Sequence, residues 1–180
     1  IIALISTRMV QTNVVGRCAS LLPAFTTVAM RSKGEPISIL EIGASAGLNL
    51  LWDRYGYSYG EGLTCGNPAS PVQLSCTVRG RYRPPVPDVL PAVVSRLGLD
   101  LNPIDLYDTE AAQWLTALVW PERGDERKLL EAAIGIAQSD PPTVMPGDAL
   151  KLLPEVAKTV PQDATLCLFH THTLNQFSLE

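Results

Sequence analysis

The chain has 180 residues, with 14 Lys and Arg against 18 Asp and Glu, a formal net charge of −4 and 46% hydrophobic residues. A chain of this length can bury a core without a disulfide or a structural metal, and its four cysteines lack the pair spacings typical of zinc and redox motifs. The mild acidity argues against a nucleic-acid interface built from bulk charge, and no apolar run is long enough to span a membrane.

We therefore expect one cytoplasmic domain over residues 1–180 that binds neither membrane nor nucleic acid. The chain begins at Ile1 and stops soon after an apolar stretch that ends at Phe169. From this we expect a fragment that is truncated at its C-terminus.

Apolar residues spaced by three and four from Val10 to Ala29 predict an amphipathic N-terminal helix, which we place over residues 7–31. Residues 36–54 then predict a strand, a glycine-bearing turn and a helix in immediate succession. The strand, residues 37–42, is short and mostly apolar, which is typical of a strand buried on both faces.

Residues 55–92 are rich in proline and tyrosine, and apolar residues alternate from Val72 to Val78, which predicts a small, half-exposed β insertion. In residues 93–180, strands and helices alternate. Strands are expected at 93–100, 143–145 and 165–170, and helices at 109–120, 126–138 and 149–158. The last strand, residues 165–170, is mostly apolar, and we expect it to be buried. This order predicts an α/β fold with a Rossmann-like, largely parallel sheet flanked by helices.

Polar residues follow the predicted core strands. Glu41, Asp100, Asp148 and His170 each stand at or just after a strand end. Because ligands bind outside the carboxyl ends of an open parallel sheet, we expect these residues to border a ligand site. Glycines after the first strand allow close backbone approach to a ligand. Asp100 could accept hydrogen bonds from ribose hydroxyls and Asp148 one from an amino group, which indicates a nucleoside.

Each of these residues also has a purely structural interpretation. Gly43 and Gly47 could serve only the tight turn between strand and helix. Asp148 could be the N-cap of the helix beginning at Ala149, and Asp100 could shape the turn before Asn102. Their order along the chain, each at a strand end, favours the functional interpretation.

The turn lacks the G-x-G-x-x-G pattern of dinucleotide-binding proteins and the Lys-Ser/Thr pair of a phosphate loop. Residues 41–47, Glu-Ile-Gly-Ala-Ser-Ala-Gly, instead resemble the first motif of class I S-adenosylmethionine-dependent methyltransferases. That resemblance implies S-adenosylmethionine as cofactor, methyl transfer to an unidentified acceptor, and a binding set of Glu41, Gly43, Ala44, Ser45, Gly47, Asp100, Leu101, Asn102, Asp148 and Ala149.

The chain also resembles a narrower group, the bacterial family called domain of unknown function 2332. The resemblance rests on the stretches 41–50, 53–55, 98–103, 118–121 and 169–170. It implies a methyltransferase-like fold and a longer native chain, in a family without an established reaction. A non-catalytic relative that binds a ligand or assembles with a partner is therefore a second interpretation.

A third interpretation comes from the same turn, because Gly43–Gly47 has the form G-x-S-x-G of the serine hydrolase nucleophile elbow. Ser45, Asp100 or Asp148, and His170 follow in the order nucleophile, acid, histidine. A hydrolase usually has several strands before the elbow, whereas only a helix is expected here. This makes the hydrolase the weaker alternative.

His170 ends the last predicted strand, where a histidine could act as a general base in methyl transfer or simply satisfy a backbone group. Residues two apart on a strand face the same way, so His170 and His172 could share a metal. No third ligand is evident, and we expect no metal site.

Overall fold

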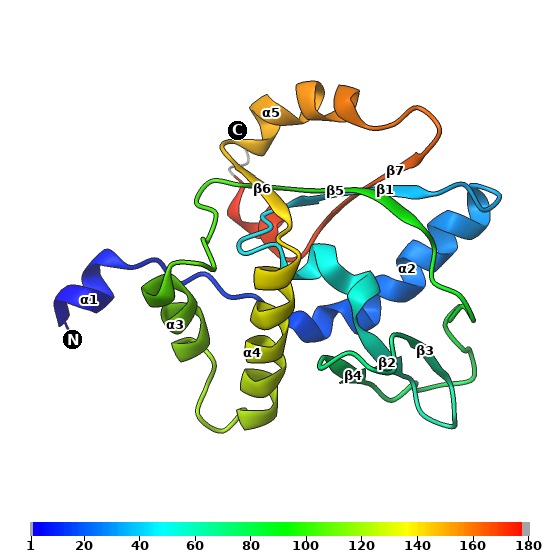
Figure 1. The fold of residues 1–180 in the computed structure, drawn as a ribbon, viewed down its shortest axis with the longest axis horizontal. Coiled ribbons are helices and arrows are strands. Elements are labelled where there is room, and N and C mark those ends of the chain that lie inside the picture. The colour runs from blue at the N-terminus through cyan, green and yellow to red at the C-terminus, as the bar shows by residue number, and fades with distance from the viewer. Residues whose placement is uncertain (1, 178–180) are drawn as a thin grey trace.

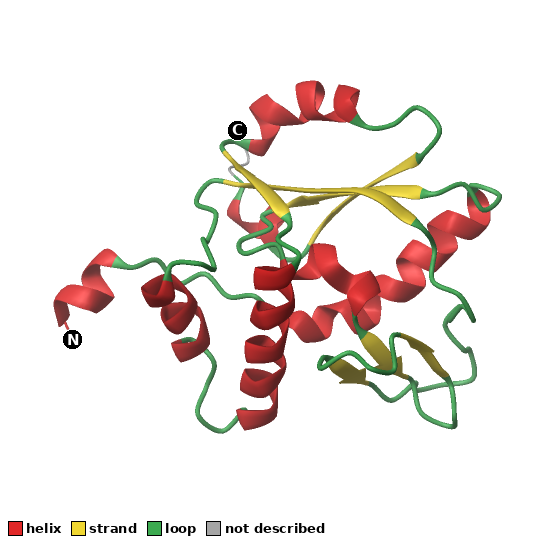
Figure 2. Ribbon diagram, viewed as in Figure 1, coloured by secondary structure: helices red, strands yellow, loops and turns green. Residues whose placement is uncertain are grey.

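The computed structural model describes residues 2–177, and side chains from residue 5 onward. A four-stranded sheet forms its centre (Figures 1 and 2). Its strands, in spatial order, are β6 (Thr143–Pro146), β5 (Val93–Asp100), β1 (Ile37–Ile42) and β7 (Thr165–His170). All neighbouring strands are parallel, which confirms the α/β class and the parallel sheet. The chain moves from β1 outward to β5 and β6, then returns to the other side of β1 with β7.

Helices cover both faces of this sheet (Figure 1). One face carries most of them: α2 (Cys18–Arg31), the 3-10 helix η2 (Leu48–Arg54), α3 (Thr109–Ala117) and α4 (Gly124–Ser139). The other face carries α5 (Ala149–Val156) and the short 3-10 turn η3 (Ala157–Thr159). Among the described residues no helix is both long and apolar enough to cross a membrane.

The proline- and tyrosine-rich segment forms a second, small sheet. Its strands are β2 (Gly56–Ser58), β3 (Thr64–Gly66) and β4 (Gln73–Ser75), in the order β3-β2-β4. Two buried tyrosines dock this sheet on the core, since Tyr57 donates a 2.6 Å hydrogen bond to Trp52 O and Tyr59 a 2.7 Å one to Ala19 O.

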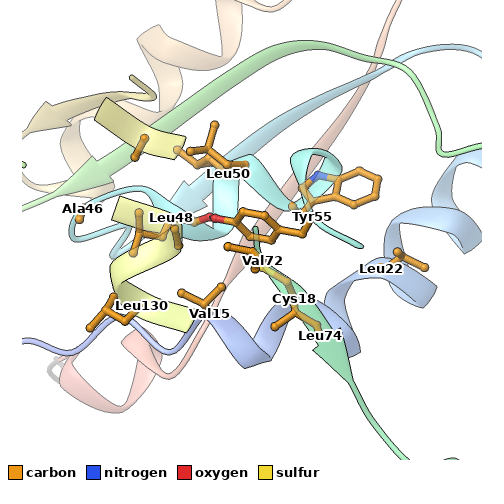
Figure 3. Packing of buried hydrophobic residues seen from close by; sticks show 14 of the residues in the cluster. Val15, Cys18, Leu22, Ala46, Leu48, Leu50, Tyr55, Val72, Leu74 and Leu130 are labelled. Atoms are coloured by element: carbon orange, nitrogen blue, oxygen red, sulfur yellow. The ribbon is translucent and has the colours of Figure 1, made fainter. Parts of the chain in front are cut away.

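The main core lies between the large sheet and α2, η2 and α4. Phe25 of α2 is buried, with its ring 4.8 Å from that of Trp52 and 5.1 Å from that of Phe169. Tyr55 lies in the same apolar cluster, near Leu48 and Val72, and donates a 2.7 Å hydrogen bond to Leu48 O (Figure 3). Burying one such large side chain stabilises the fold by about 2 kcal/mol. The Tyr55 bond also connects the residue after η2 to its first residue, Leu48.

The N-terminal helix predicted over residues 7–31 is wrong at its beginning. The structure has a short helix α1 (Ile2–Thr7), an extended segment, the 3-10 turn η1 (Val15–Arg17) and only then α2. Side chains and backbone of the extended segment bond to distant parts of the chain, such as Trp114 Nε1 to Met9 O at 3.0 Å. Tertiary contacts thus override the helical spacing of its apolar residues.

Two further predictions need correction. Residues 48–54 form the 3-10 helix η2, with non-helical dihedrals at Leu51, rather than a regular α-helix. Strand β7 is not buried on both faces, because among the described residues it is an edge strand that pairs with β1 alone. On the α5 face of the sheet, its Leu166 and Leu168 are 37% and 45% exposed. The chain continues past β7 into the 3-10 turn η4 (Thr173–Gln176).

Candidate functional site

The carboxyl ends of the four parallel strands bring the predicted site residues to one edge of the sheet. Glu41 and Asp100 lie on the same face, because Glu41 pairs with Gly98 and side chains two apart on a strand share a face. The strand order reverses between β1 and β7, and such a reversal creates the crevice in which open parallel sheets bind ligands.

The loop after β1 is held close to β5. Gly43 N donates a 2.7 Å hydrogen bond to Leu99 O. A Cβ at Gly98 would lie 2.5 Å from the Cβ of Ala44, so glycine at this position lets the loop pack directly on the strand. Gly47 has a φ of +73°, and a Cβ there would lie 2.7 Å from Cγ of Pro142. The glycines therefore have a demonstrable structural role.

Ser45 lies in the middle of this loop. Its φ is +57°, in the left-handed region that few non-glycine residues adopt. The residue is 3% exposed, and its Oγ has no hydrogen-bond partner among the described residues. Its backbone N–H donates a 2.8 Å hydrogen bond to Oδ2 of Asp100. The loop thus presents a backbone donor, rather than the hydroxyl, to the acid.

Asp100 is the centre of the site. Besides the bond from Ser45, its Oδ1 accepts hydrogen bonds from Asn102 N at 2.8 Å and from Gln11 Nε2 at 3.1 Å. The residue is 8% exposed, and its backbone oxygen accepts a 2.8 Å bond from Gly147 N. The carboxylate therefore joins the loop after β1, the turn after β5 and the N-terminal segment.

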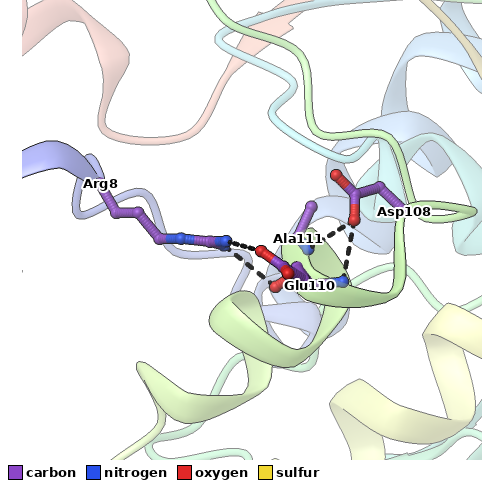
Figure 4. Close-up of polar contacts among 4 residues, drawn as sticks. All are labelled: Arg8, Asp108, Glu110 and Ala111. Carbon is purple, nitrogen blue, oxygen red and sulfur yellow. Dashed lines mark hydrogen bonds and ion pairs between the residues drawn. The ribbon is translucent and has the colours of Figure 1, made fainter. Parts of the chain in front are cut away.

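Gln11 belongs to a segment that α3 holds in place. Arg8 forms a 2.7 Å ion pair with Oε2 of Glu110 and donates a 3.1 Å bond to Glu110 O (Figure 4). The same guanidinium lies 5.7 Å from the ring centre of Trp114. Asp108 caps α3 by accepting bonds from the N–H groups of Glu110 and Ala111. Residues 8–11 thus form a strap, the N-terminal strap, between α3 and Asp100.

Glu41 is fully buried within a second polar cluster. Its Oε1 accepts a 2.9 Å bond from Asn49 Nδ2 and a 3.3 Å bond from the Thr171 hydroxyl. Arg17 donates to the same Thr171 Oγ1 at 3.2 Å, and the Cys18 thiol donates to Asn49 Oδ1 at 3.5 Å. The other carboxyl oxygen, Oε2, is buried without a partner in the part of the chain that the structure describes.

Burial raises the pKa of the Glu41 carboxyl to about 8, and the hydrogen bonds from Asn49 and Thr171 and the charge of Arg17 only partly oppose that rise. Glu41 is therefore mostly protonated at neutral pH. A neutral carboxylic acid can donate as well as accept a hydrogen bond.

Asp148 has the capping role that its sequence position also allowed. It is the N-cap of α5 and accepts a 2.9 Å bond from Leu150 N, with Lys151 Nζ 3.8 Å away. Ala149 is buried beneath the other face of the sheet, and Leu101 is 78% exposed. Asp148 nonetheless lies at the same sheet edge as Asp100, because β6 pairs with β5 and Gly147 bonds to Asp100.

His170 lies apart from the two acids. It pairs with Ile42, whereas Glu41 pairs with Phe169, so the side chains of His170 and Glu41 leave the sheet on opposite faces. His170 is exposed, and His172 follows outside the strand with a φ of +68°. Within the described residues no group of three metal-binding side chains occurs. Thr173 next along the chain donates a 3.0 Å bond to Ile42 O and lies against Gly43.

The sequence predictions missed four contributors: Gln11, Arg17, Asn49 and Thr171. Asn49 follows the predicted turn 43–47 by two residues, and Thr171 follows the predicted strand 165–170 directly. Polar residues at such places could have been recognised as candidates for the site. Gln11 and Arg17 reach the site from a segment predicted to be helical, and nothing local in the sequence indicates their contacts.

The fold and this polar edge define the class: an α/β protein with an open parallel sheet and a candidate ligand site at its carboxyl ends. A model of the bacterial family described as "Uncharacterized protein conserved in bacteria (DUF2332)" matches residues 1–180, and the chain belongs to that family. Comparison with curated proteins and with solved structures gives no match.

Proposed function

We propose that this protein binds S-adenosylmethionine or a closely related adenosyl ligand at the carboxyl edge of the sheet and transfers its methyl group to an acceptor. The observation that carries the proposal is the bond between Ser45 N and Asp100 Oδ2, because it joins a glycine-bearing loop and a strand-end acid beside the point where strand order reverses.

The donors and acceptors at this edge fit a nucleoside. Asp100 offers a carboxylate to ribose hydroxyls once Gln11, its one side-chain donor among the described residues, gives way. Two buried polar atoms at the loop, Glu41 Oε2 and Ser45 Oγ, have no partner among the described residues, and a bound polar ligand could supply one.

Each residue at this edge would have a distinct role in ligand binding or methyl transfer. Asp100 holds the ribose, Gly43–Gly47 allow the backbone to approach the ligand, and protonated Glu41 offers its unpartnered Oε2 as a hydrogen-bond donor. The bound ligand supplies an electrophilic methyl group. His170 lies on the opposite face of the sheet from Glu41 but ends β7 at the same carboxyl edge, and it is the candidate for accepting a proton from the methyl acceptor.

Isothermal titration calorimetry with S-adenosylmethionine tests the proposal. We expect saturable binding, and a loss of about 1.5 to 3 kcal/mol in binding free energy for Asp100→Ala, because the change removes a charged acceptor. Asp125→Ala makes the same charge change at an exposed position on α4 and should bind as the wild type does. Absence of binding to folded wild-type protein would refute the proposal.

A serine hydrolase remains the second candidate, and the left-handed φ of Ser45 favours it, since a nucleophile elbow is a strained turn. Against it, Ser45 Oγ is buried without a partner among the described residues, and His170 is exposed. A fluorophosphonate distinguishes the two, because only a hydroxyl activated by a nearby base reacts with it. Stoichiometric labelling at Ser45 would reverse the ranking.

Turnover distinguishes the catalytic proposal from the non-catalytic alternative. If His170 is a general base, turnover should fall by roughly 10² to 10⁴ while adenosyl affinity stays the same. If the domain only binds its ligand, no methyl transfer to any acceptor accompanies that binding in the wild type.

A further inference from the structure

A cavity of about 280 Å³ lies away from the candidate site, between residues 12–16, the C-terminal end of α3 and the first half of α4. Its inner wall is apolar and buried, since Val15, Leu115 and Leu130 are each at most 3% exposed. The loop from α3 to α4 borders it and carries Trp120, which is 72% exposed. The chain after α1 passes α3 on its way to α2 (Figure 1). Residues 12–16 of this segment supply the remaining wall.

One polar side chain in this lining lacks a partner. Asn13 is 8% exposed, and its Nδ2 has no hydrogen-bond partner among the described residues. Buried amide groups in native proteins are nearly always hydrogen-bonded, and an exception calls for an explanation such as a missing ligand. A molecule in the cavity that carried an amide or carbonyl could complete the bonding of Asn13.

Size and charge restrict the class of molecule. A cavity of about 150 Å³ can hold a benzene ring, so 280 Å³ accommodates one ring with a short substituent. The two ionic side chains at the cavity, Arg123 and Glu126, form an ion pair at 2.9 Å and balance each other. An uncharged ligand therefore fits this lining better than a carboxylate or an amine.

We propose that this cavity is a binding site for a small uncharged aromatic molecule that carries an amide or carbonyl, with its ring among Val15, Leu115 and Leu130 and its polar group on the Asn13 side chain. The wall formed by residues 12–16 connects Gln11, which bonds to Asp100, with Arg17, which bonds to Thr171. An occupant therefore contacts the segment that carries two donors of the candidate site. Binding in the cavity does not depend on adenosyl binding.

Phenylacetamide is the probe, and ethylbenzene, similar in size but without the amide, is its control. Nuclear Overhauser effects between the probe ring and the methyl groups of Leu115 and Leu130 locate it in the wild-type protein without any mutation. We expect saturable phenylacetamide binding at this place, about tenfold tighter than that of ethylbenzene. No saturable binding, or contacts only elsewhere on the protein, would overturn the proposal.

Asn13→Leu separates a ligand-binding role from a structural one. We expect the variant to lose the preference for phenylacetamide over ethylbenzene and to melt at or above the wild-type temperature, because an unpaired buried amide is removed. Gln113→Leu, at an exposed position on α3, should keep the preference. If Asn13→Leu keeps the preference and lowers the melting temperature, the amide serves the fold alone and the assignment of Asn13 is wrong.

Discussion

The backbone N–H of Ser45 and the carboxylate of Asp100 are 2.8 Å apart and join the loop after β1 to the end of β5. This bond lies at the buried edge of the sheet, where a hydrogen bond to a charged acceptor is about twice as strong as one between neutral groups. The same carboxylate that is proposed to hold a ribose therefore also stabilises the loop in the ligand-free protein.

Asp100→Asn should lower the free energy of unfolding by about 1 to 3 kcal/mol, because an amide can no longer accept bonds on both sides. Urea denaturation measures this loss. Asp125→Asn, which changes a carboxylate that is 97% exposed, should leave stability unaltered. An unchanged midpoint for Asp100→Asn would mean that the three bonds to its carboxylate contribute nothing.

The N-terminal strap competes with the proposed ligand at Asp100. Gln11→Ala should strengthen S-adenosylmethionine binding by about tenfold, since a hydrogen bond to a charged acceptor contributes about 1.5 kcal/mol or more. Calorimetry measures the change, and Gln113→Ala on α3 is the matched control. Weaker binding in Gln11→Ala would show that Gln11 holds the ligand rather than competing with it.

Glu41 makes stability depend on pH. The pKa of this carboxyl is about 8 in the folded protein and about 4.3 in an unfolded chain. The folded state binds the proton more tightly, so the contribution of Glu41 is fully present at low pH and is lost as pH rises toward 8. In that interval the slope is about 1.4 kcal/mol per pH unit.

Glu41→Gln removes this titration and resembles the protonated acid, whose Oε1 accepts from Asn49. The variant should match the wild type near pH 4 and become progressively more stable than it as the pH approaches 8. Denaturation curves at several pH values provide the comparison. A constant difference across that range would place the Glu41 pKa near its ordinary value.

Gly98 tests the close packing of the loop on β5. Gly98→Ala should destabilise the protein by about 1 to 3 kcal/mol, because the new methyl group would overlap Ala44. Gly135→Ala in α4 is the control, since nothing lies within 4 Å of its added Cβ and alanine favours a helix by up to about 1 kcal/mol. Thermal melting should shift in opposite directions for the two variants.

Local sequence patterns predicted the strands of the large sheet well. Strand β5 begins and ends where the alternation from Val93 to Asp100 does, and β1 coincides with the apolar run 37–42. These patterns suffice because each strand is a continuous stretch whose own apolar residues indicate that it is buried. The position of strand β7 was predicted correctly, but its partial exposure was not. The exposure of a strand depends on which strands lie beside it in the sheet, and its own residues do not reveal this.

The site was predictable only in part. Asp100 and Glu41 follow from their places at strand ends, whereas Gln11 and Arg17 come from a segment whose helical spacing is overridden by contacts with residues 89 and 154 positions away. The sequence around Asp148 fitted both a ligand-binding residue and a helix N-cap, and local sequence could not distinguish the two. In the structure Asp148 accepts a hydrogen bond from Leu150 N and caps α5.

Amide chemical shifts of the isotopically labelled protein during titration with S-adenosylmethionine test the central claim most directly. We expect saturable shifts at Gly43, Ser45, Gly47 and Asn102. The shifts of Gln11 should change at the same ligand concentrations, as its side chain leaves Asp100. Shifts confined to other parts of the chain, or none with a folded protein, would contradict the placement of an adenosyl ligand at the carboxyl edge of the sheet.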